Sequence, residues 1–259
     1  MTLTLLQLVL GALSGALVGF SLALVGGGGS ILAVPLMVYL VGVKNPHLAI
    51  GTSALAVAAN AGLGLTHHAR AGHVRWPCGL VFAAAGIVGA FGGSTLGKAV
   101  DGQKLLFLFA LVMILVGALM LRRRTKAPNH DAHLDATNAA PLAGLGLLAG
   151  LFSGFFGIGG GFLIVPALIA AINITMINAV GTSLIAVTAF GLTTAFNYAL
   201  SGLVDWPLAA VFIAGGLLGS MAGTRMARHL SAKGRLTQVF AALIFVVAAY
   251  MLWRQWAAL

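Results

Sequence analysis

Long apolar stretches separated by short polar ones make up almost the whole chain. Crossing the hydrocarbon core of a bilayer takes about 20 residues. Apolar runs suited to crossing lie near Leu3–Leu24, Leu48–Leu65, Leu80–Leu96, Leu105–Leu121, Leu142–Ile172, Ile177–Leu200, Leu208–Met226 and Val239–Trp253. Almost nothing is left over for a soluble domain. The pattern therefore predicts an all-α polytopic membrane protein.

Two of the apolar stretches are associated with a cluster of glycines. The segment 26–30 (Gly-Gly-Gly-Gly-Ser) continues into 31–35, and the segment 157–161 (Gly-Ile-Gly-Gly-Gly) continues into 162–166, with a proline at the end of each. A bilayer offers no water to exposed backbone N–H groups, so this backbone must be buried or used. Paired interruptions in matching positions of two halves are a sequence indication of a transporter's substrate site.

The two halves share further motifs at a nearly constant offset. Gly51-Thr52-Ser53 matches Gly181-Thr182-Ser183, and the Gly72–Pro77 segment matches Gly202–Pro207, with Trp-Pro at the end of each. Such matches indicate an internal repeat. We predict a first transmembrane repeat over 1–121, a basic linker over 122–140 and a second transmembrane repeat over 141–259.

The sequence leaves the number of membrane crossings open. One straight helix from Leu3 to Val43 would be about 60 Å long, twice the hydrocarbon thickness, so it must break at the glycines. If Ile31–Val43 is re-entrant, each half has four spans and the repeats are parallel. If it crosses the membrane, each half has about five segments and the repeats are inverted.

Loop charge favours the inverted arrangement. With five crossings in each half, one side of the membrane carries most of the basic residues. These are Arg70, Arg75, Arg122, Arg123, Arg124, Lys126, Arg225, Arg228, Lys233 and Arg235. The other side carries Lys44, Lys98, Lys104 and Arg254. Lys and Arg collect in cytoplasmic loops, which places both termini outside.

Composition points away from cations as substrates. The formal net charge is +10 and there is no Glu, while the four carboxylates are Asp101, Asp131, Asp135 and Asp205, all at predicted helix ends or in loops. Carriers of cations or protons usually place a carboxylate inside the membrane. The basic excess is read mainly as topology signal, with attraction of an anion as the functional alternative. Nucleic-acid binding is not expected, and the single Cys78 is read as a small apolar filler.

Backbone N–H groups at the start of a helix, together with the helix dipole, favour negative charge. Hydroxyl pairs and two amides within apolar helices could add hydrogen bonds to an oxyanion. The predicted substrate-binding residues are Gly28, Gly29, Ser30, Thr52, Ser53, Asn60, Gly159, Gly160, Gly161, Thr182, Ser183 and Asn197. Each group also has a structural interpretation: glycines permit a bend or a close crossing, hydroxyls cap or back-bond their own helix, and amides join helices.

The histidines have a structural interpretation as well. His67, His68, Arg70, His73 and Arg75 form a basic cluster where a helix is expected to leave the membrane, which fits interfacial anchoring better than an entrance for anions. The histidines of 130–133 are expected in a solvated loop. The chain has no nucleophile with its base, no complete phosphate loop and no dinucleotide fingerprint. We therefore expect neither an enzyme nor a cofactor.

The order of these motifs resembles that of a known family. A glycine-rich break, an aliphatic-proline segment, Gly-Thr-Ser and a Trp-Pro helix start, all duplicated, are similar to the TauE/SafE sulfite exporters, also called the sulfonate permease family. The resemblance covers nearly the whole chain except the linker. It implies an integral protein of the bacterial inner membrane that moves small sulfur oxyanions. Ser30 stands where the second copy has Gly161, a departure from an ideal repeat.

The expected function is export of sulfite or a small organosulfonate, driven by the membrane potential. The expected partners are this small anion, of sulfite, sulfonate or thiosulfate type, and the lipid bilayer. Formation of a homodimer stays open. Two alternatives also stay open, a carrier of transition metals or organic cations with His67, His68 and Asn60 among its ligands, and a membrane scaffold without transport.

Overall fold

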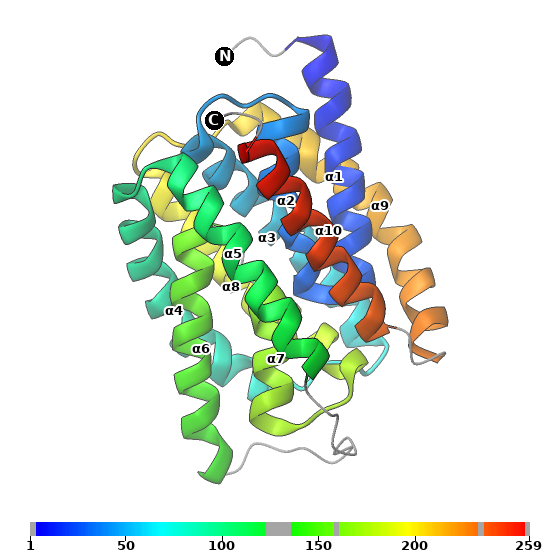
Figure 1. The fold of residues 1–259 in the computed structure, drawn as a ribbon. Coiled ribbons are helices and arrows are strands. Elements are labelled where there is room, and N and C mark those ends of the chain that lie inside the picture. Colours follow the sequence, from blue (N-terminus) through cyan, green and yellow to red (C-terminus); the bar gives the residue numbers. More distant parts are fainter. Residues whose placement is uncertain (1–3, 123–135, 158–160, 233–235, 257–259) are drawn as a thin grey trace.

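The computed structural model describes residues 4–122, 136–157, 161–232 and 236–256, and within them every regular element is helical. In chain order these elements are α1 (Leu5–Val25), η1 (Gly26–Leu32), α2 (Ala33–Pro35), η2 (Leu36–Leu40), α3 (Pro46–Arg70), α4 (Trp76–Ala99), α5 (Gly102–Arg122), α6 (Ala136–Phe156), α7 (Gly161–Ile172), α8 (Met176–Ala199), α9 (Trp206–Ala232) and α10 (Leu236–Trp256). Figure 1 shows them as one bundle. The all-α class predicted from the sequence is confirmed.

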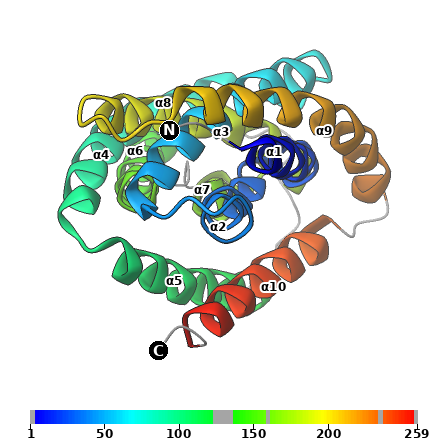
Figure 2. The same cartoon turned by 90° about the horizontal axis from the view of Figure 1, so that it is seen from above.

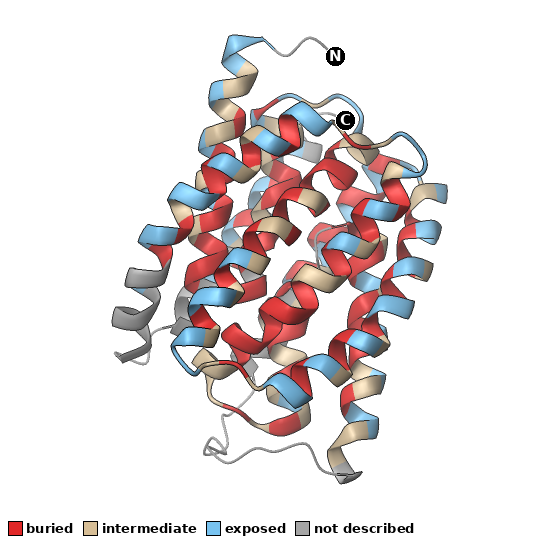
Figure 3. Ribbon diagram, turned by 180° about the vertical axis from the view of Figure 1, so that it is seen from behind, coloured by how far each residue is buried: buried red, intermediate tan, exposed pale blue. Residues whose placement is uncertain are grey.

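Six helices in the described part of the chain are long and apolar enough to cross a membrane: α1, α3, α4, α6, α8 and α9. The segment Gly29–Leu40 and parts of α5, α7 and α10 form shorter apolar helices. Large apolar side chains point outward from the bundle, such as Val88 in α4, which is 68% exposed, and Leu218 in α9, which is 73% exposed. Figure 3 shows buried residues toward the middle of the bundle and exposed ones on its outer faces. Such an outer surface suits contact with lipid.

The helices lie in pairs around two short broken segments. Helix α1 packs along α9, α4 along α6, α3 along α8, and α5 along α10. In Figure 2, α5 and α10 form one wall, α8, α3 and α9 lie opposite, and α2 and α7 lie between the two walls. The chain therefore keeps both glycine-broken segments inside the bundle.

Glycines permit the closest of these pairings. A β-carbon on Gly15 or Gly19 of α1 would run into the backbone of α9 at Phe212 and Gly216, respectively. A β-carbon on Gly89 or Gly93 of α4 would likewise run into the backbone of α6. Small residues at such crossings let helix backbones approach. Glycine at these positions thus permits the close crossings of α1 with α9 and of α4 with α6.

Equivalent helices of the two predicted repeats run in opposite directions. A β-carbon on Gly191 of α8 would lie 2.9 Å from Ala58 of α3, and one on Gly64 would lie 3.5 Å from Leu184. Because the order of contacts is reversed, α3 and α8 are antiparallel. In Figure 1, α1 starts at the same end of the bundle at which α10 finishes, and α6 starts at the opposite end.

Several helix starts follow from their sequences. Helices α4 and α9 begin at Trp76 and Trp206, as the Trp-Pro motifs predict, and proline is well tolerated in a first turn. The Asp205 carboxylate accepts the N–H of Leu208 at 3.1 Å, and Asp101 accepts those of Gln103 and Lys104 at 3.0 and 3.1 Å. Both carboxylates thus cap helix starts, as their positions in the sequence indicate. Helix α6 already begins at Ala136, so the end of the segment 122–140, which we predicted as linker, is helical.

Candidate functional site

The two glycine breaks begin at matching residues with the same backbone conformation. Gly26 follows α1 with φ 68°, and Gly157 follows α6 with φ 68°. This left-handed region is open to glycine and strained for most other residues. A β-carbon on Gly26 would lie 2.8 Å from the carbonyl oxygen of Val180 in α8, and one on Gly157 would run into Ile50 of α3. Gly26 therefore packs against the first turns of α8, and Gly157 packs against the first turns of α3.

The breaks touch each other at Gly27 and Gly161. A β-carbon on Gly27 would lie 2.5 Å from Gly161 Cα and 2.5 Å from Val187 Cγ2 of α8, and one on Gly161 would overlap the Gly27 backbone. The backbone of η1 and the start of α7 thus meet in direct contact inside the bundle. Residues 158–160, with the predicted site residues Gly159 and Gly160, lie outside the described part of the chain.

Two buried hydroxyls bind the peptide groups of Gly27. Ser183 Oγ accepts the Gly27 N–H at 3.2 Å and donates to the Val180 carbonyl at 2.8 Å. Ser30 Oγ donates to the Gly27 carbonyl at 2.8 Å. Both serines are fully buried. The structure thus brings Ser30, Gly161 and Ser183 together around Gly27 in the interior of the bundle.

The remaining glycines of the first break belong to the 3-10 helix η1. At this break the segment Gly26–Leu32 is helical. Gly28 lies within it. Gly29 packs so closely on α1 that a β-carbon would run into the backbone at Ser21 and Leu22. Glycine allows this segment to double back against the helix that precedes it.

The threonines of the hydroxyl pairs join the two halves reciprocally. Thr52 Oγ1 in α3 accepts the N–H of Asp205, just before α9, at 2.9 Å. Thr182 Oγ1 in α8 accepts the N–H of Arg75, just before α4, also at 2.9 Å. Both threonines are fully buried. Each side chain holds the start of a Trp-Pro helix in the other predicted repeat, at the matching position.

Ser53 occupies the position in α3 that Ser183 occupies in α8. Its Oγ donates to the Ile50 carbonyl at 3.1 Å, as Ser183 does to Val180. Ile50 is the residue that contacts Gly157 at the second break. The serines of the two hydroxyl pairs therefore lie at the glycine breaks, whereas the threonines face the helix starts.

The two predicted amides differ in their surroundings. Asn197 Nδ2 donates to Ser94 Oγ at 2.6 Å and Thr95 Oγ1 at 2.9 Å, and its Oδ1 accepts from Lys98 Nζ at 2.7 Å. Asn197 thus joins α8 to α4. Asn60 is 2% exposed, and neither of its amide atoms has a hydrogen-bond partner among the described residues.

The histidine cluster does not assemble a metal site within the described ranges. The rings of His68 and His73 are 5.8 Å apart, whereas His67 is exposed and binds the Leu63 carbonyl through Nδ1 at 3.0 Å. No group of three His, Cys, Asp or Glu side chains suited to a metal ion occurs in the part of the chain that the structure describes. The histidines predicted in a loop at 130–133 lie outside that part.

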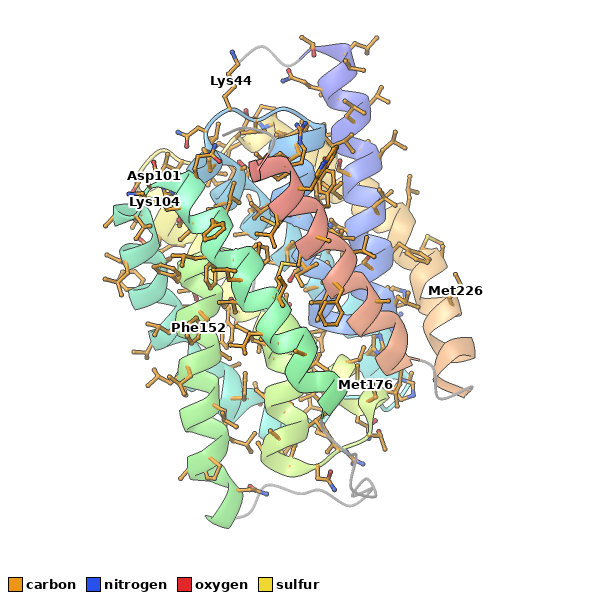
Figure 4. All side chains as sticks on the ribbon, in the orientation of Figure 1. Lys44, Asp101, Lys104, Phe152, Met176 and Met226 are labelled. Atoms are coloured by element: carbon orange, nitrogen blue, oxygen red, sulfur yellow. The ribbon has the colours of Figure 1, made fainter. Side chains whose placement is uncertain are left out.

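Sequence reasoning missed three features of this region. Gly27, the centre of the crossing, was one glycine among four and carried no distinguishing signal. Val187 looks like an ordinary apolar position of α8. Lys98 was interpreted only as topology signal, yet its ammonium also donates to the Asn197 carbonyl at 3.1 Å and to Ser201 Oγ at 2.9 Å. Figure 4 places neighbouring charged residues, Lys44, Asp101 and Lys104, at one end of the bundle and Met176 near the other.

Comparisons with known proteins agree with the motifs. The model of the family described as "Sulfite exporter TauE/SafE" matches residues 11–251. A "Probable membrane transporter protein" of Xylella fastidiosa is 52% identical over 99% of both chains. Proteins with descriptions of the same kind are 28% identical in Bacillus subtilis, over 81% of this chain and 86% of the relative, and 30% identical in Haemophilus influenzae, over 73% of each.

None of the solved structures matches the chain at a significant level. The family match covers both glycine breaks, both Gly-Thr-Ser motifs and both Trp-Pro helix starts. Together with the helices that are able to span a bilayer, the match identifies the chain as a multi-pass membrane transporter that belongs to the TauE/SafE sulfite exporter family.

Proposed function

We propose that the protein exports a small sulfur oxyanion, such as sulfite or an organosulfonate, across the inner membrane of a bacterium. The observation that carries the proposal is the contact of the two glycine breaks at Gly27 and Gly161, with Ser30 and Ser183 beside it. Backbone N–H groups at a helix start and neighbouring hydroxyls suit an anion. The family description, which names sulfite, supports the substrate class.

Charge inside the bundle fits an anionic substrate. Asp101 and Asp205 are both engaged in capping helix starts. A buried carboxylate would repel an oxyanion and would serve a cation or proton carrier instead. In the described spans the buried polar side chains are hydroxyls and amides, together with the imidazole of His68. These groups can donate to an oxyanion without binding it too strongly to be released.

A negative interior would drive an anion outward. The membrane potential contributes about 2.3 kcal/mol per elementary charge per 100 mV. A dianion would gain about twice that amount, and a monoanion would still leave spontaneously. We propose facilitated efflux without a coupling ion.

We propose further that residues 1–121 and 141–259 are inverted repeats with about five segments each, both termini lying outside. The antiparallel α3 and α8 and the reciprocal Thr52–Asp205 and Thr182–Arg75 contacts support this relation. In inverted repeats, substrate sites lie near the midplane where broken helices meet. Alternating access would then move one repeat against the other around the Gly27–Gly161 contact.

Binding can be tested before transport. We expect sulfite, thiosulfate, sulfoacetate or taurine to raise the melting temperature of the detergent-solubilised protein, because a ligand that binds only the native state stabilises it. Chloride at the same ionic strength is the control. An equal response to every anion, or no response to any, would contradict a specific sulfur-oxyanion site.

A further inference from the structure

Asn60 is a buried amide within the membrane-spanning helix α3. It is 2% exposed, and neither Nδ2 nor Oδ1 has a hydrogen-bond partner among the described residues. An amide without a partner in an apolar interior is destabilising, and buried amides are normally hydrogen-bonded. Asn197, the other amide within an apolar helix, has partners for both amide atoms. Hydrogen bonding to the described residues therefore accounts for the amide of Asn197 but not for that of Asn60.

Packing does not explain the amide. A β-carbon on Gly216 of α9 would lie 2.5 Å from Asn60 Cγ and 2.6 Å from Oδ1, so Asn60 rests on that glycine. The matching residue of the other predicted repeat is Phe190, which rests in the same way on Gly86. An apolar side chain thus fills the same role in the other half. The first half keeps a polar group where packing alone does not require one.

Asn60 lies at the level of the glycine contact. The α3 positions on either side of it face α8, since a β-carbon on Gly62 would lie 3.7 Å from Thr188 Cγ2 and one on Gly191 would lie 2.9 Å from Ala58 Cβ. Val187, next to Thr188, contacts Gly27. The unpartnered amide therefore lies at about the height of the glycine contact, on the side of α3 that faces α9.

We infer that Asn60 recognises the transported oxyanion, an inference that rests on the proposed function. The Nδ2 group donates to an oxygen of the anion, and Oδ1 accepts from a donor that the same substrate carries. Among small sulfur oxyanions, the site therefore prefers those with a hydrogen-bond donor of their own, such as hydrogen sulfite or an aminosulfonate. An anion that only accepts, such as methanesulfonate, leaves Oδ1 unpaired and binds more weakly.

Replacing Asn60 by leucine tests this inference with two readouts. In the absence of anion, Asn60→Leu raises the melting temperature by about 2–4 °C, because it removes an unpaired polar group. In proteoliposomes the same variant lowers kcat/KM for sulfite by about tenfold or more, as expected when a hydrogen bond to an anion is lost. It also loses the preference for sulfite over methanesulfonate in competition.

The matched control is Phe190→Leu, which changes the equivalent apolar position and keeps the sulfite preference. Asn60→Ala serves as a second variant should leucine not fit, and it loses the same preference. A lower melting temperature of Asn60→Leu with an unchanged KM for sulfite would show a structural amide and overturn the inference. Absence of sulfite binding in the wild-type protein would instead overturn the proposed function, and this inference with it.

Discussion

Gly27 and Gly161 contact each other through their backbones, with no room for a side chain on either residue. A β-carbon on Gly27 would lie 2.5 Å from Gly161 Cα, and one on Gly161 would overlap the Gly27 backbone. The two residues come from breaks 131 positions apart in matching sequence contexts, counted from Gly26 and Gly157. This contact fixes where the two predicted repeats meet inside the bundle.

Gly161→Ala is expected to abolish most transport. The added methyl group must push η1 and α7 apart, at a cost of about 1–3 kcal/mol in the free energy of unfolding. A displacement of about 1 Å at a binding site can lower activity by about a hundredfold. Sulfite flux in proteoliposomes measures the effect. Wild-type flux in the variant would show that the glycine contact serves only helix packing and not transport.

The matched control for this substitution is Gly92→Ala in α4. A β-carbon there meets nothing within 4 Å, and the residue lies within a helix. Alanine has a higher helix propensity than glycine by about 1 kcal/mol, so stability is expected to hold or rise. Flux should stay at the wild-type level. Reduced flux in this control would show that any change in the bundle impairs transport.

The reciprocal threonine contacts are expected to contribute equally to stability. Thr52→Val and Thr182→Val keep the shape of the side chain but leave the N–H of Asp205 and Arg75, respectively, without the acceptor seen at 2.9 Å. Each should lower the free energy of unfolding by about 1–3 kcal/mol. Chemical denaturation in detergent measures this, and serine at either site should restore stability. A neutral valine at both sites would show that these hydrogen bonds do not join the halves.

Lys98 and Asn197 are expected to act as one unit. The ammonium donates to Asn197 Oδ1 at 2.7 Å and to the Asn197 carbonyl at 3.1 Å, and it also contacts the Ser201 hydroxyl and the Tyr198 ring. A double-mutant cycle with Lys98→Met and Asn197→Leu should give a coupling of about 0.5–3 kcal/mol. Asn197→Leu alone should destabilise, opposite in sign to Asn60→Leu. Additive effects of the two substitutions would show that the pair is not coupled.

The inverted arrangement makes a clear prediction about accessibility. Lys44 lies two residues before α3 begins and Arg70 ends that helix, so the two residues lie at opposite ends of one spanning helix. In a Cys78→Ser background, cysteine at position 44 or 104 should react with an impermeant maleimide from outside the cell. Cysteine at position 70 should react only after the membrane is opened. Labelling of positions 44 and 70 from the same side would contradict the arrangement.

Much of the fold could be predicted from the sequence because its signals are local. Apolar length, the glycine clusters and the Trp-Pro motifs are enough to locate the spans, the breaks and the starts of α4 and α9. Helix α6 begins at Ala136, inside the predicted linker, because Ala136 to Ala140 carry no strong signal that separates linker from helix. The number of crossings and the inversion remain predictions, since hydropathy does not record direction.

The candidate site could be predicted only in part because its contacts join distant segments. The hydroxyl pairs were recognisable, but no sequence pattern separates Ser183, which binds Gly27, from Thr182, which binds Arg75. The same limit applies to the two amides. Asn60 and Asn197 both lie in apolar helices, and only the neighbouring helices α4 and α9 determine that one is fully hydrogen-bonded and the other is not.

We propose that an anion crosses the membrane at the contact of the glycine breaks. The most direct test of this proposal is the flux of labelled sulfite from proteoliposomes with an imposed potassium diffusion potential, comparing the wild-type protein with Gly161→Ala. We predict efflux that accelerates when the interior is negative, slows when the potential is reversed and is lost in the variant. Efflux that does not respond to the potential, or no flux of sulfite, thiosulfate, sulfoacetate or taurine at all, would contradict the account.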